Sequence, residues 1–339
     1  MEKLKISGAQ SDSTLLIGES FKNFKNYLPN KQVIVLIDDK VRSLYGSYFD
    51  NYPIIEIGQT EKVKTLSTVE YILEQLLNLN ADRSAFLLAV GGGIVCDIAG
   101  FAASIYLRGI DFGFISTTLL AQVDASVGGK NGVNFHGFKN MVGIFNQPNF
   151  VLCDQEMLKT LSPDDLNCGF AEIVKHTLIA DADMFAYLEQ NVEKALTIDP
   201  IFIEALVSNS VKIKAGIVNR DEKEKGERRK LNLGHTYGHA VEKVMGISHG
   251  NAVSIGLAIA ANLSLNRNTI TQNEYNRIIN LLKALNLPVS INEKHQEILE
   301  ALFMDKKREG NQIHFVLMQG IGKVSLELIT IDELRKIKL

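Results

Sequence analysis

The sequence has few cysteines, no strong excess of charge of either sign and no long apolar run. Its 339 residues include three cysteines, Cys96, Cys153 and Cys168, none of them in a CxxC spacing. A small, odd number of cysteines argues against a disulfide framework and favours a reducing compartment, so we expect a cytoplasmic protein. The formal net charge of −3 gives no cationic field that would attract nucleic acid or an anionic membrane.

Segments for export or membrane insertion are also lacking. The amino-terminal MEKLKISGAQ has no basic stretch followed by an apolar core, so we expect no secretory signal. The longest apolar run, residues 252–263, is shorter than the about 20 residues that cross a bilayer and predicts a buried helix instead. A composition of 46% apolar and 22% charged residues is typical of a globular protein, and the length suits about two domains.

Short β-branched runs alternate with helical patterns in the first half of the chain. We predict strands at residues 32–37, 53–57, 84–90, 112–120 and 149–153, and helices at 41–48, 63–79 and 95–106. Such alternation is typical of a parallel sheet. We therefore predict an α/β fold, with an amino-terminal Rossmann-like, doubly wound parallel-sheet domain at residues 1–154. The remainder, residues 155–339, is predicted to be mainly α-helical, with a late hairpin of strands 313–318 and 323–329.

Three glycines, Gly91 to Gly93, follow the predicted strand at 84–90 directly and precede a helix. Glycines at this place let the backbone approach a ligand, and the helix amino terminus offers free N–H groups to a diphosphate. The pattern GGGxxxD, which ends at Asp97, is not GxGxxG, so a tight strand-to-helix turn is the alternative. Thr117 and Thr118, after the next strand, could also reach a nucleotide.

A glycine-rich segment, residues 124–143, contains Asp124, Lys130, Lys139 and Asn140. Two lysines among glycines favour a backbone that cradles an anion. The alternative is a solvated loop without a ligand.

The window LNLGHTYGHAVEKVMGISHG, residues 231–250, contains three of the chain's seven histidines. His235 and His239 stand four residues apart in a helical pattern, so they share one face, which is the spacing of metal ligands. His249 follows just before a new apolar helix and could supply another imidazole. The alternative is a helix with two surface histidines.

Glu172 and Lys175 stand three residues apart on an otherwise apolar helix predicted at 169–179. Burying either charge alone is costly, so each must be paired or must bind something. The alternative to a bound ligand is a mutual salt bridge between the two residues.

Six blocks of the sequence, taken in order, resemble the 3-dehydroquinate synthase family. They are GGGIVCDIAGFAASIYLRG, TTLLAQVDASVGGKNGVN, KNMVGIFNQP, GFAEIVKH, GERRKLNLGHTYGHAVE and HGNAVSIG. The resemblance implies an enzyme that uses NAD and a divalent metal, zinc or cobalt. It would convert 3-deoxy-D-arabino-heptulosonate 7-phosphate into 3-dehydroquinate and phosphate, a step of the shikimate pathway, and it would be a homodimer.

The same resemblance assigns roles to residues. Glu172, His235 and His249 would be the metal ligands, whereas His239, which spacing alone suggests as a ligand, would face the substrate. Glu224 matches an acid/base position, and Arg108 matches an arginine that reaches phosphate across a dimer interface. The remaining positions that match substrate-binding residues are Asp124, Lys130, Asn140, Lys175, Lys214, Arg228, Asn232 and one of Lys306 and Lys307.

Residues at or near matching cofactor positions form a further set. For NAD they are Asp39, Glu61, Lys64, Gly92, Gly93, Asp97, Thr117, Thr118, Lys139, Leu158, Lys159 and Thr160.

Three alternatives share the same motifs. Another sugar phosphate cyclase, of the 2-deoxy-scyllo-inosose or epi-valiolone type, is disfavoured because Lys214, Arg228, Asn232 and His239 together fit the dehydroquinate pattern. A metal-dependent glycerol or polyol dehydrogenase would accumulate NADH. A catalytically dead relative would not need the complete set of ligands and cations.

Overall fold

The computed structural model describes residues 1–8, 11–291, 294–303, 308–309 and 312–335. The chain forms two compact units: the first contains residues 1–160 and 214–223, and the second contains residues 161–213 and 224–339. The domain boundary predicted after residue 154 stays a prediction. Within the described part of the chain, no helix combines the length and the apolar character needed to cross a bilayer.

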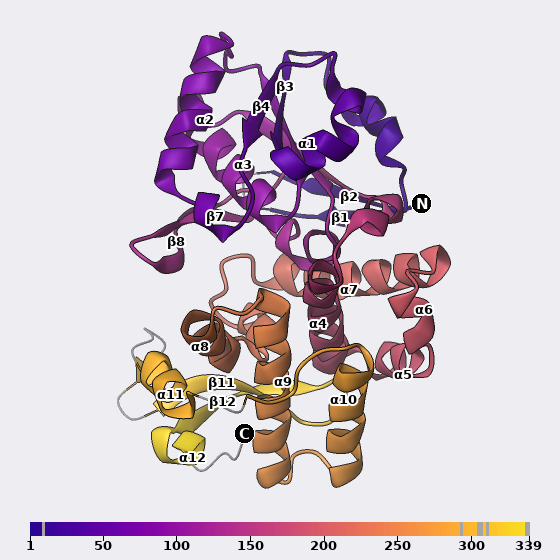
Figure 1. Cartoon of the computed structure of the whole chain (residues 1–339), viewed down its shortest axis with the longest axis vertical. Coiled ribbons are helices and arrows are strands. Elements are labelled where there is room, and N and C mark those ends of the chain that lie inside the picture. The colour runs from indigo at the N-terminus through magenta and orange to yellow at the C-terminus, as the bar shows by residue number, and fades with distance from the viewer. Residues whose placement is uncertain (9–10, 292–293, 304–307, 310–311, 336–339) are drawn as a thin grey trace. The chain divides into compact units, whose positions relative to one another are not determined.

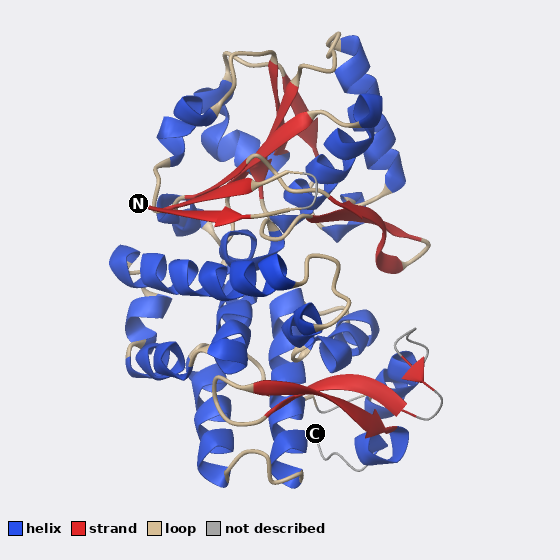
Figure 2. Cartoon of the chain, turned by 180° about the vertical axis from the view of Figure 1, so that it is seen from behind, coloured by secondary structure: helices blue, strands red, loops and turns tan. Residues whose placement is uncertain are grey.

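A seven-stranded sheet organises the first unit (Figure 1). Its strands are β1 (Glu2–Ile6), β2 (Ser13–Ile17), β3 (Val33–Asp38), β4 (Ile54–Ile57), β5 (Phe86–Gly91), β6 (Asp111–Ser116) and β9 (Phe150–Cys153). They lie in the order β1-β2-β9-β6-β5-β3-β4, and β1 with β2 is the one antiparallel pair among them. Every residue of β3 and β5 is buried, as expected where helices cover both faces of a parallel sheet (Figure 2).

Two of the α-helices of this unit, α1 (Asp39–Tyr45) and α2 (Leu66–Asn78), begin where a short polar side chain caps them. The unit also contains α3 (Gly93–Ile105) and the short turns η1 (Phe21–Tyr27), η2 (Gly46–Phe49), η3 (Glu61–Val63), η4 (Tyr106–Arg108), η5 (Ala121–Ala125) and η6 (Gln155–Thr160). The Asp38 carboxylate accepts the Val41 N–H at 2.8 Å, and the Thr65 hydroxyl accepts the Thr68 N–H at 3.2 Å. The predicted parallel α/β architecture is confirmed.

The predicted strands differ from the structure at two places in this unit. The strand predicted at 112–120 ends at Ser116, because the Thr118 hydroxyl accepts the Ala121 N–H and starts the π-helical turn η5. The glycine-rich segment, where no strand was predicted, forms the antiparallel strands β7 (Lys130–Phe135) and β8 (Phe138–Phe145), and its proposed role as an anion cradle stays a prediction. Gly132 and Gly143 pair in register there, and a Cβ on either would lie 2.5 Å or less from the opposite backbone.

The second unit is mainly helical, as predicted. Its elements are α4 (Pro163–Ala180), α5 (Ala182–Gln190), α6 (Val192–Leu196), α7 (Pro200–Arg220), η7 (Glu227–Asn232), α8 (His235–Met245), α9 (His249–Asn266), α10 (Gln272–Ala284), α11 (His295–Phe303), β10 (Arg308–Glu309), β11 (Gln312–Met318), β12 (Val324–Thr330) and α12 (Ile331–Arg335). From Lys214 onward, α7 is grouped with the first unit. The predicted buried helix at 252–263 is the core of α9, and the predicted late hairpin is β11 and β12.

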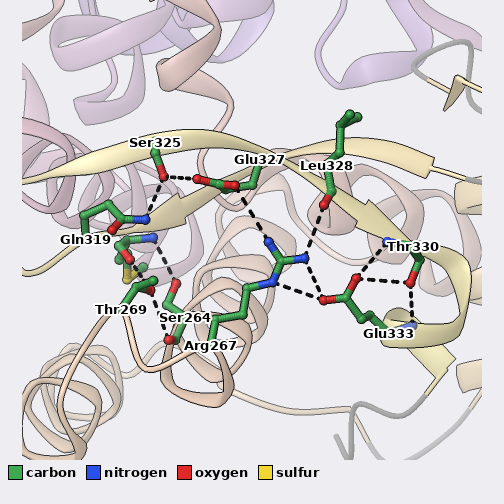
Figure 3. Close-up of polar contacts among 10 residues, drawn as sticks. Ser264, Arg267, Thr269, Gln319, Ser325, Glu327, Leu328, Thr330 and Glu333 are labelled. Atoms are coloured by element: carbon green, nitrogen blue, oxygen red, sulfur yellow. Dashed lines mark hydrogen bonds and ion pairs between the residues drawn. The ribbon is translucent and has the colours of Figure 1, made fainter.

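A single apolar core joins α8, α9, α11 and the hairpin. Its fully or nearly fully buried members include Tyr237, Val241, Ile255, Ile259, Leu299, Leu317 and Ile329. The end of α9 is tied to the hairpin by Arg267, whose guanidinium lies between two carboxylates in Figure 3. It donates to Glu333 Oε1 at 2.6 Å and to the Leu328 carbonyl at 3.2 Å, and it lies 3.8 Å from Glu327 Oε2. These contacts attach the carboxy-terminal end of α9, the helix that begins with His249, to the hairpin.

Candidate functional site

Helix α4 carries two charged residues into the interior of the second unit. Ser162 caps this helix, and Pro163 follows at its first position, so α4 begins at a defined residue. Glu172 and Lys175 are both buried, and Lys175 Nζ forms an ion pair with Glu172 Oε2. The mutual salt bridge is therefore present, and it involves one of the two carboxylate oxygens.

The other oxygen of Glu172 meets two histidines from different helices. His235 Nε2 lies 3.3 Å from Glu172 Oε1, and His249 Nε2 lies 3.2 Å from the same atom. His235 is the first residue of α8, and His249 is the first residue of α9. Sequence segments more than 60 residues apart thus converge on one carboxylate.

Close helix packing makes this convergence possible. A Cβ added to Gly250 would lie 2.3 Å from Cys168 Cα, so α9 contacts the α4 backbone at that point. A Cβ added to Gly256 would lie 1.8 Å from the Gly234 carbonyl oxygen, so α9 also touches the segment that leads into α8. Side chains at these glycines would push the three helices apart and separate Glu172 from the two imidazoles.

The geometry of this group fits a divalent metal. Ligand atoms of Glu172, His235 and His249 all lie within 4.8 Å of one another. Two ligands about 2.0–2.1 Å from a tetrahedral zinc are about 3.3 Å apart, which is close to the 3.2 and 3.3 Å observed. A carboxylate with two imidazoles is also a donor set that zinc accepts while keeping a fourth position open.

The protonation of the group suits this chemistry. Burial acts to raise the pKa of Glu172, but Lys175 and His235 outweigh it and hold that pKa well below the ordinary value. Burial lowers the pKa of His235. Burial also acts to lower the pKa of His249, but hydrogen bonds to Glu172 and Glu242 outweigh it and raise that pKa to about 9. Glu172 is therefore ionised at neutral pH, and a metal ion would have to displace a proton from His249.

His239 is the exposed member of the histidine cluster. Its ring centroid lies 5.3 Å from that of His235 and 6.2 Å from that of His249. Because α8 turns its side chain outward, it is more accessible than the two histidines that face Glu172. A second set of possible ligands nevertheless includes it, together with Glu242 and His249.

The segment before α8 holds three more predicted site residues. Asn232 Nδ2 donates to Glu224 Oε1 at 2.6 Å, so these two side chains lie together. Glu224 has a φ of 56°, in the left-handed region, which directs its side chain differently from a helical residue. Arg228 is buried on η7 at 1% exposure.

In the first unit, the glycine turn after β5 packs against the end of β6. A Cβ on Gly92 would lie 2.9 Å from Thr118 Cγ2, so only glycine allows this approach. Gly92 is also the amino-terminal cap residue of α3 and has no side chain to occupy the free N–H groups. One turn later, Asp97 forms an ion pair with Lys64, which is buried.

Another ion pair of the first unit joins Lys214 and Asp124. Lys214 Nζ donates to the Asp124 backbone carbonyl at 2.7 Å and pairs with its carboxylate.

The β7–β8 hairpin carries both lysines of the glycine-rich segment and the asparagines Asn134 and Asn140. Lys139 Nζ lies 3.9 Å from Glu61 Oε1, and Asn134 Nδ2 donates to the same oxygen at 2.8 Å. The Asn140 N–H donates to Asn134 Oδ1 at 2.9 Å, and Lys130 begins β7 with its side chain exposed.

Other predicted residues lie apart from these groups. Asp39, at the start of α1, accepts from Gln59, and Arg108 is exposed at the end of η4. On η6, Leu158 is buried, Lys159 pairs with Glu156 at 2.7 Å, and the Thr160 hydroxyl lies 3.1 Å from that of Tyr45. Two further predicted residues belong to the glycine turn after β5: Thr117 is buried and donates its N–H to the Gly91 carbonyl, and Gly93 packs against Ala125. Lys306 and Lys307 fall outside the described residues.

Sequence reasoning missed two polar residues of these groups. Glu242 lies one helical turn after His239 on α8, so its i+3 spacing was an available signal. Asn134 gave no such signal, because its link between Glu61 and Asn140 arises from the hairpin.

Models of two protein families match the chain. The 3-dehydroquinate synthase N-terminal model matches residues 54–168, and the 3-dehydroquinate synthase C-terminal model matches residues 169–308. A 3-dehydroquinate synthase of Campylobacter hominis is 41% identical over 313 residues, which cover 89% of this chain and 90% of that protein. One from Coxiella burnetii is 39% identical over 341 residues, covering 95% and 94%.

Solved structures agree with this match. A 2-deoxy-scyllo-inosose synthase complexed with carbaglucose-6-phosphate, NAD+ and Co2+ has a TM-score of 0.88 and 26% identity, covering 99% of this chain and 98% of that one. A 2-epi-5-epi-valiolone synthase from Streptomyces hygroscopicus, with NAD+ and Zn2+ bound, has a TM-score of 0.88 and 27% identity, covering 97% and 96%. A probable glycerol dehydrogenase from Sinorhizobium meliloti, at 16% identity and a TM-score of 0.62, shares the fold alone. Because the two models together match residues 54–308 and relatives 41% and 39% identical cover 89% and 95% of this chain, the chain belongs to the 3-dehydroquinate synthase family.

Proposed function

We propose that the protein converts 3-deoxy-D-arabino-heptulosonate 7-phosphate into 3-dehydroquinate and phosphate, as a carbon–oxygen lyase of the shikimate pathway. The observation that carries this proposal is the convergence of Glu172, His235 and His249 on one point in a chain of this family. The shikimate step further rests on relatives that are named 3-dehydroquinate synthase over most of the chain.

The proposed metal ligands are Glu172, His235 and His249, and zinc or cobalt suits them. A bound divalent cation would polarise a substrate hydroxyl and favour its alkoxide. His239, exposed beside this group, is proposed to hydrogen-bond the substrate or move a proton. Glu224 is proposed as a second acid/base group, because Asn232 donates to its carboxylate and would orient it.

A substrate with a phosphate and a carboxylate needs several fixed cations and hydrogen-bonding groups. We propose that the residues matched by the family resemblance supply them. The set comprises Asp124, Lys130, Asn140, Lys175, Lys214, Arg228, Asn232, Arg108 and one of Lys306 and Lys307. The ion pairs of Lys214 with Asp124 and of Lys175 with Glu172 hold two of the cations in fixed positions.

NAD is the proposed second cofactor, and it supplies reversible oxidation of one hydroxyl. The glycine turn at Gly92 and Gly93 supports this, because the start of α3 offers free N–H groups to a diphosphate. The remaining proposed contacts are Asp39, Glu61, Lys64, Asp97, Thr117, Thr118, Lys139, Leu158, Lys159 and Thr160.

We expect a redox-neutral cycle, in which NAD is required but not consumed. Phosphate leaves by elimination only when the neighbouring C–H is acidified by a transient ketone, so oxidation must come first and can be reversed afterwards. With NAD, zinc and the heptulosonate phosphate, purified protein should release many equivalents of phosphate per bound NAD. Absorbance in the NADH band should not rise lastingly.

Other outcomes of that experiment favour other functions. One NADH formed per phosphate, or NADH without phosphate, would replace the cyclase proposal with a glycerol or polyol dehydrogenase. Turnover of a different sugar phosphate would assign the chain to another cyclase type, which the similarity to 2-deoxy-scyllo-inosose synthase keeps open. No turnover of any of these would indicate a catalytically inactive relative.

We further propose a cytoplasmic homodimer in which Arg108 acts in the partner's site. Arg108 follows two exposed apolar residues, Ile105 at 40% and Leu107 at 39%, which a partner surface would cover. Mixing Arg108→Ala with His235→Ala should therefore restore activity in heterodimers, because one of the two sites in each heterodimer then has both residues. If mixed dimers form but stay inactive, the arginine acts within its own subunit.

A further inference from the structure

Glu242 is a buried carboxylate on α8 that contacts His249, a proposed metal ligand. Its Oε2 is 3.5 Å from His249 Nδ1, on the opposite side of the ring from Nε2, which lies 3.2 Å from Glu172. Glu242 is 9% exposed, so its charge is largely removed from water. A buried carboxylate is costly unless something compensates it, and the nearby imidazole N–H is suited to that task.

His235 shows the same arrangement with a different acceptor. Its Nδ1 lies 3.1 Å from the Leu233 backbone carbonyl, and its Nε2 lies 3.3 Å from Glu172. Both imidazoles thus meet an oxygen acceptor at Nδ1 and direct Nε2 towards the same carboxylate. A proton held on Nδ1 leaves the Nε2 lone pair available as a ligand.

We propose that Glu242 is a positioning residue that fixes the ring orientation and the tautomer of His249 for metal binding. The inference rests on the proposed function, because it concerns the metal site formed by Glu172, His235 and His249. A carboxylate that accepts the second N–H of a metal-bound histidine orients the ring and makes it a stronger ligand.

The ring of His249 is less restrained by its surroundings than the ring of His235. Its side chain is 28% exposed, compared with 11% for His235, so fewer neighbours restrain its ring. His249 is also the first residue of α9, and the preceding cap residue, Ser248, makes no side-chain capping bond. Glu242 reaches it from α8, and the contact therefore also links the ends of two helices that each carry a ligand.

A rival role for Glu242 is direct metal binding. Glu242, His239 and His249 also offer ligand atoms within 4.8 Å of one another. If that arrangement used His249 Nδ1 as a ligand, Glu242 could not accept a proton from that nitrogen. The two roles predict different metal stoichiometries, because direct binding would add a second ion to the site at Nε2.

The test compares zinc binding by the wild-type chain, Glu242→Ala and Glu242→Gln, measured by competition with a chromophoric chelator. We expect one zinc per chain in all three. Affinity should fall about 10–100-fold in Glu242→Ala, the usual effect of losing such a contact. The loss in Glu242→Gln should be smaller, since the amide oxygen can still accept the Nδ1 proton. Glu297→Gln, on the exposed face of α11, should bind zinc as the wild type does.

Cobalt absorption and unfolding separate positioning from a general structural role. At saturating Co²⁺, the visible bands of Glu242→Gln should shift, because the strength of the His249 ligand changes, whereas those of Glu297→Gln should not. Unfolding in chelator shows whether each variant is folded before metal is added. The inference is overturned if Glu242→Ala binds zinc with wild-type affinity, or if the wild type binds two zinc ions and Glu242→Ala one. A wild-type chain that binds no zinc would instead remove the proposed function itself.

Discussion

Replacing His235 with alanine should remove the metal from the protein and abolish phosphate release. His235 Nε2 supplies one of three ligand atoms around the Glu172 carboxylate, and a metal held by the remaining two has lost a third of its protein donors. Changes that only reorient a ligand cost about 10–100-fold in affinity, so loss of the ligand itself should cost more than about 100-fold. Elemental analysis after gel filtration should find well under one equivalent of zinc.

His136→Ala is the matched control for this experiment. His136 is an exposed histidine in the turn of the β7–β8 hairpin, distant in sequence from the ligand helices. Its replacement should leave a full equivalent of zinc bound. A full equivalent in His235→Ala as well would show that His235 is not a ligand and would return His239, its neighbour at i+4, to consideration.

The sequence could predict many of the helices and strands, but not the contacts between them. Alternation of β-branched runs and helical patterns was sufficient for the parallel sheet, whose strands β3 and β5 are buried along their whole length. Spacing alone suggested His235 and His239 as the ligand pair. In the structure it is His249 that shares Glu172 with His235, because helix packing at Gly250 and Gly256 decides which imidazole faces the carboxylate.

The two local differences have a similar origin. Glycines and lysines in residues 124–143 gave no signal of strands, yet Gly132 and Gly143 pair across two strands that approach closely. Because these two residues have no side chains, the two backbones can approach closely. The pattern of residues along the sequence does not reveal such a contact. Likewise, Thr118 continues a β-branched run, but its hydroxyl accepts the Ala121 N–H and begins a helical turn. Side chain to backbone hydrogen bonds of this kind compete with strand formation.

Replacing Lys175 with methionine should destabilise the metal-free protein strongly and the zinc-bound protein much less. Methionine keeps most of the apolar stem but leaves the Glu172 carboxylate, which is fully buried, without its ammonium partner. Removing one member of a buried ion pair typically costs about 3–5 kcal/mol. A bound zinc ion would itself compensate the charge of Glu172, so the same substitution should cost less when zinc is present.

Denaturant unfolding with chelator and with saturating zinc measures this difference. Lys212→Met is the control, since Lys212 is exposed on α7 and its replacement should change the free energy of unfolding by less than about 0.5 kcal/mol in either condition. An equal loss for Lys175→Met with and without zinc would mean that the metal does not reach Glu172. A loss confined to the chelator condition would show that lysine and metal neutralise the same carboxylate, so that Lys175 stabilises the fold until the metal binds and is then available to the substrate's own carboxylate.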